Sequence, residues 1–338
     1  MSTIGVAISL PQMVLLFLFF LLIFPGCLFT FGMSVLLSGL DRKFVARMQR
    51  RVGPPLLQPL YDYLKCIGKE TILPRKANRF WFKAAPMIGL ASVFVTAALI
   101  PVGGVWPFSG TADLIVVLYL LTLASVMVIV GSAASASPFA GVGLSREMVA
   151  MISYELPFVL AILAVGRVAG SDLAAAANSS SLYGGMTFSF ANILAYQSAN
   201  GMLLSHWALI PAAIAMLLVI PCEAGVQPFD IDEAETEICE GVLAEYSGHP
   251  LGRYKLMHNI KMYIMAALFC VMFLYVDTGM VWANVLIFVL ETIVVTFLSM
   301  SLPHAVSARL RVEQVFKFYW TWVAGLAGVS LILVWLGL

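Results

Sequence analysis

The chain has 338 residues, of which 61% are hydrophobic and only 11% are charged, and its formal net charge is +1. A soluble domain carries about a quarter charged residues, so this composition excludes an ordinary soluble enzyme. Apolar runs of about 20 residues recur along the chain, which is the length that an α-helix needs to cross a bilayer. The sequence therefore predicts an all-α, polytopic membrane protein in which residues 1–338 form a single integral membrane domain.

Eight membrane spans are predicted from these apolar runs. Their approximate positions are 12–39, 84–104, 111–134, 147–168, 203–221, 258–276, 281–302 and 317–337. No charged side chain precedes Asp41, so the first span lacks the basic region of a cleaved signal peptide, and we expect it to remain in the mature protein.

The basic residues predict the orientation. Eleven Lys and Arg lie in 41–83, and others follow at Arg146, at Arg253, Lys255 and Lys261, and at Arg309, Arg311 and Lys317. With eight spans, 18 of the 19 basic residues share one side, and only Arg167 departs. The positive-inside rule then places both termini outside and the charged loops in the cytoplasm. These loops are expected at about 41–83, 135–146, 222–257 and 303–316.

Cofactor chemistry has no sequence signature on this chain. The five Cys residues never approach Cys-x-x-Cys spacing, the four His residues are scattered, and neither a glycine-rich phosphate loop nor a nucleophile elbow occurs. We therefore expect no catalytic residue, metal site or redox cofactor here, so that any redox chemistry belongs to partner subunits.

An acidic loop between two apolar stretches is the most informative feature. It contains no Lys or Arg between Glu223 and Arg253. Its acidic residues are Glu223, Asp230, Asp232, Glu233, Glu235, Glu237, Glu240 and Glu245. Carboxylates crowded beside a bilayer repel one another, so we expect some of them to hold protons near neutral pH and to act as a proton relay. The alternative is a solvated charged surface.

The local pattern of this loop predicts a helix. Pro228 and Asp230 are expected to open it, with Asp230 and Glu233 in capping-box spacing. On that helix Glu233, Glu237 and Glu240 would lie within about 60° of one another as one acidic stripe, with Glu235 pointing away.

The first charged loop is the electrostatic complement of the acidic one, with a net charge of +8 over 41–83. A basic helix is expected to run past Asp41, to be broken by Gly53, Pro54, Pro55 and Pro59, and to be followed by a short amphipathic helix at 61–70. Orientation alone does not require this structure, so we predict a docking platform for a soluble partner or for the acidic loop. The docking or electrostatic-partner residues are Arg47, Arg50, Arg51, Arg146, Arg309 and Arg311.

Carboxylates also occur within predicted spans. Glu147 lies at the cytoplasmic edge of the fourth span, and Glu155 lies about 12 Å deeper at 1.5 Å of rise per residue. A charged carboxylate near the bilayer centre costs about 3 kcal/mol, so Glu155 is expected to be neutral, partnered or beside a wet cavity. We interpret Glu155 as a proton relay, with a structural hydrogen bond as the alternative, and Glu291 in the seventh span as a further candidate.

Several motifs together resemble one membrane component of bacterial respiratory complex I, the NADH dehydrogenase subunit 1-like family. Its relatives include the corresponding membrane component of energy-converting nickel–iron hydrogenases and formate hydrogenlyase. The motifs are Arg51-Val52-Gly53-Pro54, Ser145-Arg146-Glu147 with Tyr154-Glu155, Pro228-Phe229-Asp230, Glu-Ala-Glu-x-Glu at 233–237, Glu245-Tyr246-Ser247-Gly248 and Ala308-Arg309-Leu310-Arg311. They follow the family's order from about residue 41 to 322, and eight spans is the family's number.

Departures from this pattern resemble the hydrogenase branch. The complex I members place a longer Gly-Pro-Asn-Arg-Val-Gly-Pro stretch near the quinone pocket, whereas here 53–55 runs straight into Leu-Leu-Gln-Pro at 56–59. Glu240 before Gly241 also resembles the hydrogenase branch. Val226 stands where the family commonly has a basic residue, which removes one expected countercharge from Glu223.

The resemblance implies a non-redox subunit beneath a soluble module that carries nickel–iron and iron–sulfur centres in hydrogenase-like large and small subunits. It also implies a location in a prokaryotic inner membrane, antiporter-like membrane neighbours, the lipid bilayer as a partner, no nucleic acid, and movement of H⁺ or Na⁺. The positions that match the family's carboxylates are Glu147, Glu155, Glu223, Asp230, Glu233, Glu235, Glu237 and Glu245. The alternatives are a quinone-reducing complex I-like or sulfur-reducing complex and, more remotely, a free-standing ion transporter.

Overall fold

The computed structural model describes residues 18–105, 112–177 and 185–337, and it gives only the backbone at 172–177, 235 and 236. Within these ranges the chain is nearly all helical, and the strand-like pairings are isolated bridges, Val102 to Val105 and Asp113 to Ser189. The predicted all-α class is confirmed. The beginning of the first predicted span, 12–17, lies outside the described residues.

The helices follow one another with short connections. In chain order they are α2 (Cys27–Met48), α3 (Gln58–Ile67), α4 (Arg79–Leu99), α5 (Leu114–Ser135), α6 (Pro138–Ala177), α7 (Phe190–Asn200), α8 (Ile210–Glu223), α9 (Glu235–Ile238), α10 (Gly248–Phe269), α11 (Val281–Thr296), α12 (Leu302–Val306), α13 (Val312–Phe318) and α14 (Ala324–Trp335). Short 3₁₀ turns are η1 (Leu203–Ser205), η2 (Trp207–Leu209) and η3 (Gly241–Leu243). Single π-helical turns, η4 (Cys270–Leu274), η5 (Phe297–Ser301) and η6 (Tyr319–Val323), extend α10, join α11 to α12 and join α13 to α14.

Seven helical segments of the described chain are long and apolar enough to cross a membrane. They are Leu18–Met48, Arg79–Leu99, Leu114–Ser135, Pro138–Ser171, Gly248–Leu274, Val281–Val306 and Val312–Trp335. The fifth predicted span, 203–221, corresponds to a shorter apolar segment, Trp207–Glu223. The multi-pass membrane architecture is therefore shown, whereas the count of eight and the orientation stay predictions.

Several helices continue beyond the predicted span edges. α6 begins at Pro138, so most of the predicted loop 135–146 is helical, and α10 begins at Gly248, inside the predicted loop 222–257. Hydropathy detects only the part of a helix that can sit in hydrocarbon, because polar residues at its end lower the average without ending the backbone hydrogen bonds. The basic helix ends at Met48 and α3 follows, but Pro59 lies in the first turn of α3 rather than in the break.

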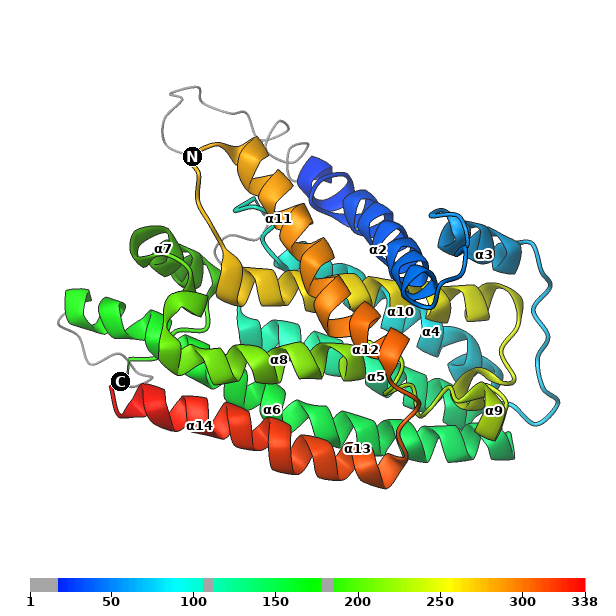
Figure 1. Cartoon of the computed structure of the whole chain (residues 1–338). Coiled ribbons are helices and arrows are strands. Elements are labelled where there is room, and N and C mark those ends of the chain that lie inside the picture. Colours follow the sequence, from blue (N-terminus) through cyan, green and yellow to red (C-terminus); the bar gives the residue numbers. More distant parts are fainter. Residues whose placement is uncertain (1–17, 106–111, 178–184, 338) are drawn as a thin grey trace.

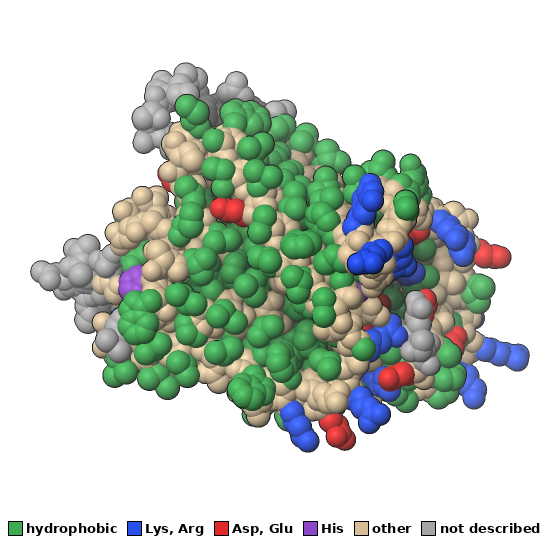
Figure 2. Space-filling view, viewed as in Figure 1, with side chains coloured by type: hydrophobic (Ala, Val, Ile, Leu, Met, Phe, Trp, Pro, Cys, Tyr) green, Lys and Arg blue, Asp and Glu red, His purple; other side chains and the backbone are tan. Residues whose placement is uncertain are grey.

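The charged side chains gather at one end of the helix bundle. Figure 1 shows α3 and α9 at that end, while the described chain starts and finishes toward the other end. Figure 2 shows Lys, Arg, Asp and Glu concentrated over the α3 and α9 end, and a mainly hydrophobic surface over the rest of this face. This distribution is the one that a bilayer-spanning bundle with one charged aqueous face requires.

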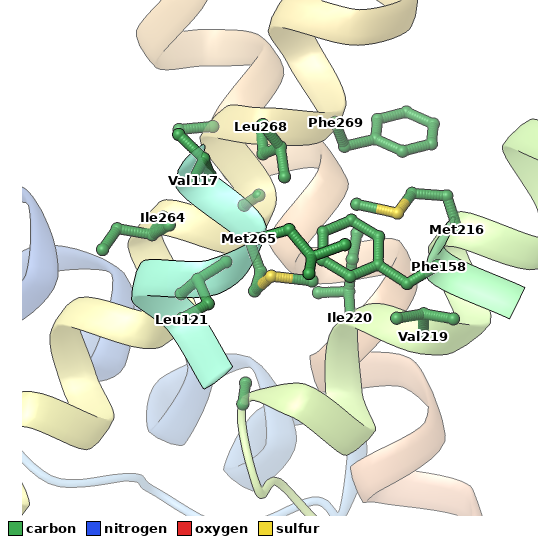
Figure 3. Packing of buried hydrophobic residues seen from close by; sticks show 14 of the residues in the cluster. Val117, Leu121, Phe158, Met216, Val219, Ile220, Ile264, Met265, Leu268 and Phe269 are labelled. Carbon is green, nitrogen blue, oxygen red and sulfur yellow. The ribbon is translucent and has the colours of Figure 1, made fainter. Parts of the chain in front are cut away.

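α10 is the central helix of the bundle. In its most apolar stretch 89% of the residues are buried inside the protein, against 28–56% in the other candidate spans. It packs against α2, α3, α4, α8 and α11. In Figure 3, Met265 of α10 lies among side chains of α5, α6 and α8, including Leu121, Phe158 and Ile220. A polar side chain within the apolar part of α10, such as Lys261, is therefore buried by protein and not by lipid.

Candidate functional site

A buried ion pair joins α8 to α10. Lys261 Nζ lies 2.9 Å from Glu223 Oε1, and the two side chains are only 8% and 1% exposed. Glu223 is the last residue of α8, where the helix reaches the charged end of the bundle. The same ammonium donates a hydrogen bond of 2.8 Å to Ser125 Oγ of α5, which lies 3.3 Å from the Tyr154 hydroxyl of α6. Two opposite charges are thus held at the centre of four helices.

Four carboxylates meet at a small cavity beside this ion pair. The cavity has a volume of about 40 Å³. Its ionisable lining residues include Glu147 of α6, Glu223, Asp232, Glu233, His258 and Lys261. They come from α6, α8, α10 and the loop before α9, so groups far apart in sequence share one enclosed space. We call these six residues the carboxylate cluster.

Backbone contacts fix the loop that carries Asp232 and Glu233. Val226 N–H donates to the Pro221 carbonyl at 2.9 Å, and Leu310 N–H donates to the Pro228 carbonyl at 3.1 Å. Gly143 of α6 lies so close that a Cβ built there would meet Val242 N at 2.7 Å, so α6 and the loop pack backbone to backbone. The cluster geometry therefore depends on glycine at this position.

Arg309 and aromatic packing hold the same loop from the other side. The Arg309 guanidinium donates to both carboxylate oxygens of Asp230, with distances of 2.8 to 3.1 Å. Phe229 packs against the rings of Phe318 and Tyr319, at centroid distances of 6.3 and 5.3 Å. The C-terminal helices thus clamp the loop onto the bundle.

Burial sets the protonation of the loop carboxyls. It raises the pKa of Glu233 to about 8, helped by the negative charges of Asp232 and Glu147. Burial also raises the pKa of Asp232 to about 6, against backbone hydrogen bonds and the charge of Lys261 that lower it. The pKa of Asp230 is raised by burial although Arg309 opposes that shift. Neighbouring groups whose pKa values lie on either side of neutral pH can exchange protons there, and this is the chemistry that the predicted relay requires.

A second cavity adjoins the cluster and shares lining residues with it. Its volume is about 210 Å³, and its lining includes Arg42, Asp62, Glu233, Lys255 and His258. Glu233 and His258 also line the inner cavity, so they form the boundary between the two. Arg42 lies 2.8 Å from Asp62. Burial raises the pKa of Asp62, but the hydrogen bonds from Arg42 and Gln58 outweigh it and the net shift is downward.

A third cavity, of about 340 Å³, lies on the α6 and α13 side of the same end. It is lined by residues that include Arg146, Glu237, Arg309, Arg311 and Glu313. Arg146 lies 2.6 Å from Glu237 and donates to the Ile231 carbonyl at 3.2 Å. Basic partners for the acidic loop thus come from α6 and from the segment before α13, as well as from Lys261.

The predicted acidic stripe does not exist. Residues 228–234 are turns and bends, and α9 contains only Glu235–Ile238. Cys239 and Glu240 then adopt left-handed backbone angles, with φ of 51° and 65°, which end the helix. Glu233 consequently faces the cluster while Glu237 is exposed beside Arg146. Helical spacing failed here because tertiary contacts fix this segment.

Other predicted residues lie apart from the cluster. Glu155 and Glu291 are half-buried on α6 and α11, and Glu240 and Glu245 are half-buried in the loop. The Glu235 side chain lies outside the described residues. Arg47, Arg50 and Arg51 are exposed on the first charged segment and form no ion pair with the described part of the chain, and their docking role stays a prediction.

Sequence reasoning missed several buried polar groups. Lys261 was counted with the loop residues, but it lies inside α10. Ser125 and His258 have no role in the sequence-based prediction, and Tyr154 enters it only as part of a family motif. The positions of His258 and Lys261 on one turn of an apolar helix are a usable signal. Asp41 is also buried, and it accepts a hydrogen bond of 2.7 Å from Ser301.

Metal binding has no candidate among the described residues, because no group of three or more His, Cys, Asp or Glu side chains there could hold an ion. The expectation that redox centres lie in partner subunits stays a prediction.

Comparisons with known proteins agree with this architecture. The family model for NADH dehydrogenase matches residues 18–335. The H component of NADH-quinone oxidoreductase from Thermomicrobium roseum is 34% identical over 266 residues, which cover 72% of this chain and 73% of the relative. Component C of hydrogenase-4 from Escherichia coli is 33% identical over 243 residues, which cover 72% and 71%.

A solved structure is also similar over almost the whole fold. It is a chain of the membrane-bound sulfane sulfur reductase, an archaeal respiratory membrane complex. The TM-score is 0.83 at 26% identity, and the match covers 95% of this chain and 99% of the other. These similarities show that the chain is a membrane subunit of the complex I-like or hydrogenase-type respiratory complexes. It belongs to the NADH dehydrogenase family.

Proposed function

We propose that this chain is the non-redox membrane anchor and ion-coupling subunit of a hydrogenase-type respiratory complex. It links electron transfer in a docked soluble nickel–iron and iron–sulfur module to translocation of protons or sodium ions. Hydrogenase-like large and small subunits dock on its charged end in the cytoplasm, and antiporter-like subunits adjoin it in the membrane.

The observation that carries this proposal is the Glu223–Lys261 ion pair within the carboxylate cluster. A buried ion pair stabilises a protein only weakly, because desolvation offsets most of the attraction. Three further carboxylates beside it add repulsion and give no structural benefit. Such an arrangement is explained if the cluster changes its charge during turnover.

The coupling step is electrostatic. Two unit charges about 4 Å apart interact with an energy of about 4 kcal/mol at an effective dielectric constant of 20. A redox or protonation change near Arg42 and Asp62 therefore shifts the proton occupancy of Glu233 and Asp232. The Lys261 ammonium responds, because it is shared between Glu223 and Ser125. The Ser125 to Tyr154 contact carries the effect onto α6, next to Glu155 in the chain.

The charged lining of the second cavity, the one that contains Arg42 and Asp62, favours the hydrogenase-type function over the quinone-reducing one. Three charged side chains, Arg42, Asp62 and Lys255, line it together with Glu233 and His258. Water fits this lining better than an apolar quinone ring and tail does. The quinone-reducing and sulfur-reducing complexes remain the alternatives.

Purification of the intact complex from its native membrane distinguishes the complexes. We expect nickel, iron and hydrogen evolution to co-purify with a tag on this chain. Iron without nickel, together with quinone- or sulfur-dependent turnover, would assign the chain to one of the alternatives.

Ion pumping by inverted vesicles tests the coupling role. We expect Glu147→Gln or Glu233→Gln to reduce ion uptake per electron while the soluble module retains electron transfer to an artificial acceptor. Glu313→Gln is the matched control, because Glu313 is exposed at the same end and lies outside the cluster. Normal pumping in both cluster variants would exclude the cluster from the ion path.

A further inference from the structure

One cavity lies at the end of the bundle away from the carboxylate cluster. It is enclosed by α6, α7, the turn before α8 and the end of α14, and its volume is about 270 Å³. Figure 1 shows α7 and the end of α14 on the opposite side from α3 and α9. Its polar lining residues are Arg167, Ser171, Tyr196 and His206.

The chemistry of this cavity differs from that of the three others. Each of those contains at least two carboxylates, whereas no carboxylate is found among the described residues that line this one. Its charged group is a guanidinium, and a phenol, an imidazole and a hydroxyl surround it. Among the described lining residues a ligand would meet no negative charge, while an anion would meet several hydrogen-bond donors.

Arg167 is held in place before any ligand arrives. Its Nη1 donates to the Gly185 carbonyl at 3.4 Å, and its guanidinium carbon lies 5.7 Å from the centroid of the Trp335 ring. These contacts engage one nitrogen and one face, and the other donors of the planar group have no partner within the described part of the chain. A guanidinium fixed in this way suits phosphate, which it binds through two parallel hydrogen bonds.

The exposed tryptophans beside the cavity indicate that its ligand is a lipid. Trp207 and Trp335 lie beside it and are 53% and 61% exposed, which is typical of aromatic side chains at the level of the lipid head groups. Val168 and Val334 complete the lining with apolar surface. A head group at this level would place its phosphate against Arg167 and its glycerol and acyl chains along the valines.

We propose that this cavity binds the phosphodiester head group of an anionic membrane phospholipid, with Arg167 as its principal ligand. The proposal explains why this one basic residue lies outside the charged end that holds the others. The bound lipid would tie α14 to α6 and α7, at the end of the subunit where few polar contacts join these helices.

The test uses the intact complex in vesicles that contain a phosphatidylglycerol with a photoactivatable group near its glycerol. Adducts are mapped by peptide mass spectrometry. We expect them on segments that include Tyr196, His206 or Val334, and we expect Arg167→Gln to reduce their yield roughly tenfold, because the charge-assisted bonds are lost. Arg167→Lys should retain part of the yield. Arg75→Gln, which replaces an exposed arginine on the first charged segment, is the matched control and should leave the adduct yield unchanged.

A second measurement on the unaltered complex keeps the test decisive if Arg167→Gln fails to assemble. A photoactivatable glycolipid with the same chains and no phosphate should give few adducts at these segments. Equal yields from the two lipids, or unchanged yield in a folded Arg167→Gln complex, would overturn the proposal. Loss of the adducts on addition of inorganic phosphate would show a site for a free anion instead of a lipid.

Discussion

Glu223 and Glu291 are both carboxylates on apolar helices, and their surroundings differ. Glu223 is almost fully buried and pairs with Lys261 at 2.9 Å. Glu291 is half-buried on α11 and has no hydrogen bond or ion pair within the described part of the chain. Its helix neighbours Leu290 and Val294 are 55% and 54% exposed, so it lies beside the outer surface of the subunit.

The difference separates two ways of placing an acid in a membrane. A carboxylate with a cation beside it keeps its charge, and its removal leaves the cation unpaired. A carboxylate without a cation is cheaper as a neutral acid, and its replacement by an amide costs little. Breaking the Glu223–Lys261 pair should therefore lower stability strongly, whereas replacing Glu291 should hardly change stability and should affect only function.

The largest effect is expected from Lys261→Met. It leaves Glu223 buried without its countercharge, and we expect the free energy of unfolding to fall by about 3 to 5 kcal/mol. Thermal unfolding of the detergent-solubilised complex measures it. Lys255→Met, at an exposed position of the same helix, is the control and should shift stability by about 0.5 kcal/mol or less. The double variant with Glu223→Gln should recover most of the loss, and a double variant as unstable as Lys261→Met would contradict the pairing.

Arg309→Gln is expected to have the next largest effect. The ion pair between Arg309 and Asp230 is partly buried, with side-chain exposures of 24% and 13%, respectively. It anchors the loop that carries Asp232 and Glu233. We expect a loss of about 2 kcal/mol, because a hydrogen-bonded charge is left without its partner. Limited proteolysis should detect cleavage in 228–240 at the same time. Arg311→Gln serves as the control, and equal sensitivity of the two variants would show that the Asp230 contact contributes nothing.

Glu233 makes stability depend on pH. Its pKa is raised from 4.5 to about 8, so the folded state binds this proton more tightly than the unfolded state does. The stabilisation is fully present below pH 4.5 and is lost as the pH rises through about 8. Between these two pH values the free energy of unfolding should fall by roughly 2 kcal/mol because of Glu233, since relaxation of the site and water entry reduce the full effect of the pKa shift. The Glu233→Gln variant should lack this fall.

Infrared spectroscopy gives a direct check on the same proton. The carbonyl absorbance of protonated carboxylic acids should lose one component as the pH is raised through about 8, and this component should be absent in Glu233→Gln. Glu313→Gln should leave the component unchanged. Titration of this component near pH 4.5 would show that Glu233 has its ordinary pKa.

Much of the fold followed from the sequence, because membrane spans are encoded by local composition. Apolar runs located the helices, and the chain-breaking prolines after Met48 separated α2 from α3. Span edges were less accurate, since helices such as α6 continue into the aqueous end. The short segment Trp207–Glu223 shows why a count of spans from hydropathy is less certain than the class.

The site was only partly predictable. The acidic loop is recognisable by its charge alone. Because it contains no Lys or Arg between Glu223 and Arg253, the sequence predicts that basic partners come from other segments of the chain. Which carboxylates meet was not encoded locally, since Glu147, Glu223 and Asp232 come from three separate segments. Lys261 was misjudged because a lysine near a helix end normally lies in water, and only the packing of α10 at the centre of the bundle buries it.

The smallest stability effect is expected at Glu291. Glu291→Gln retains the shape and the hydrogen-bonding oxygen, and no described cation loses a partner, so we expect unfolding to change by about 0.5 kcal/mol or less. If Glu291 belongs to the ion path, pumping in vesicles should nevertheless fall, because an amide cannot carry a proton. Leu290→Gln adds the same amide to the neighbouring exposed position and controls for polarity at that surface. Pumping equal to that of the unaltered complex would remove Glu291 from the path, and a loss of about 2 kcal/mol or more would reveal a partner that makes it resemble Glu223.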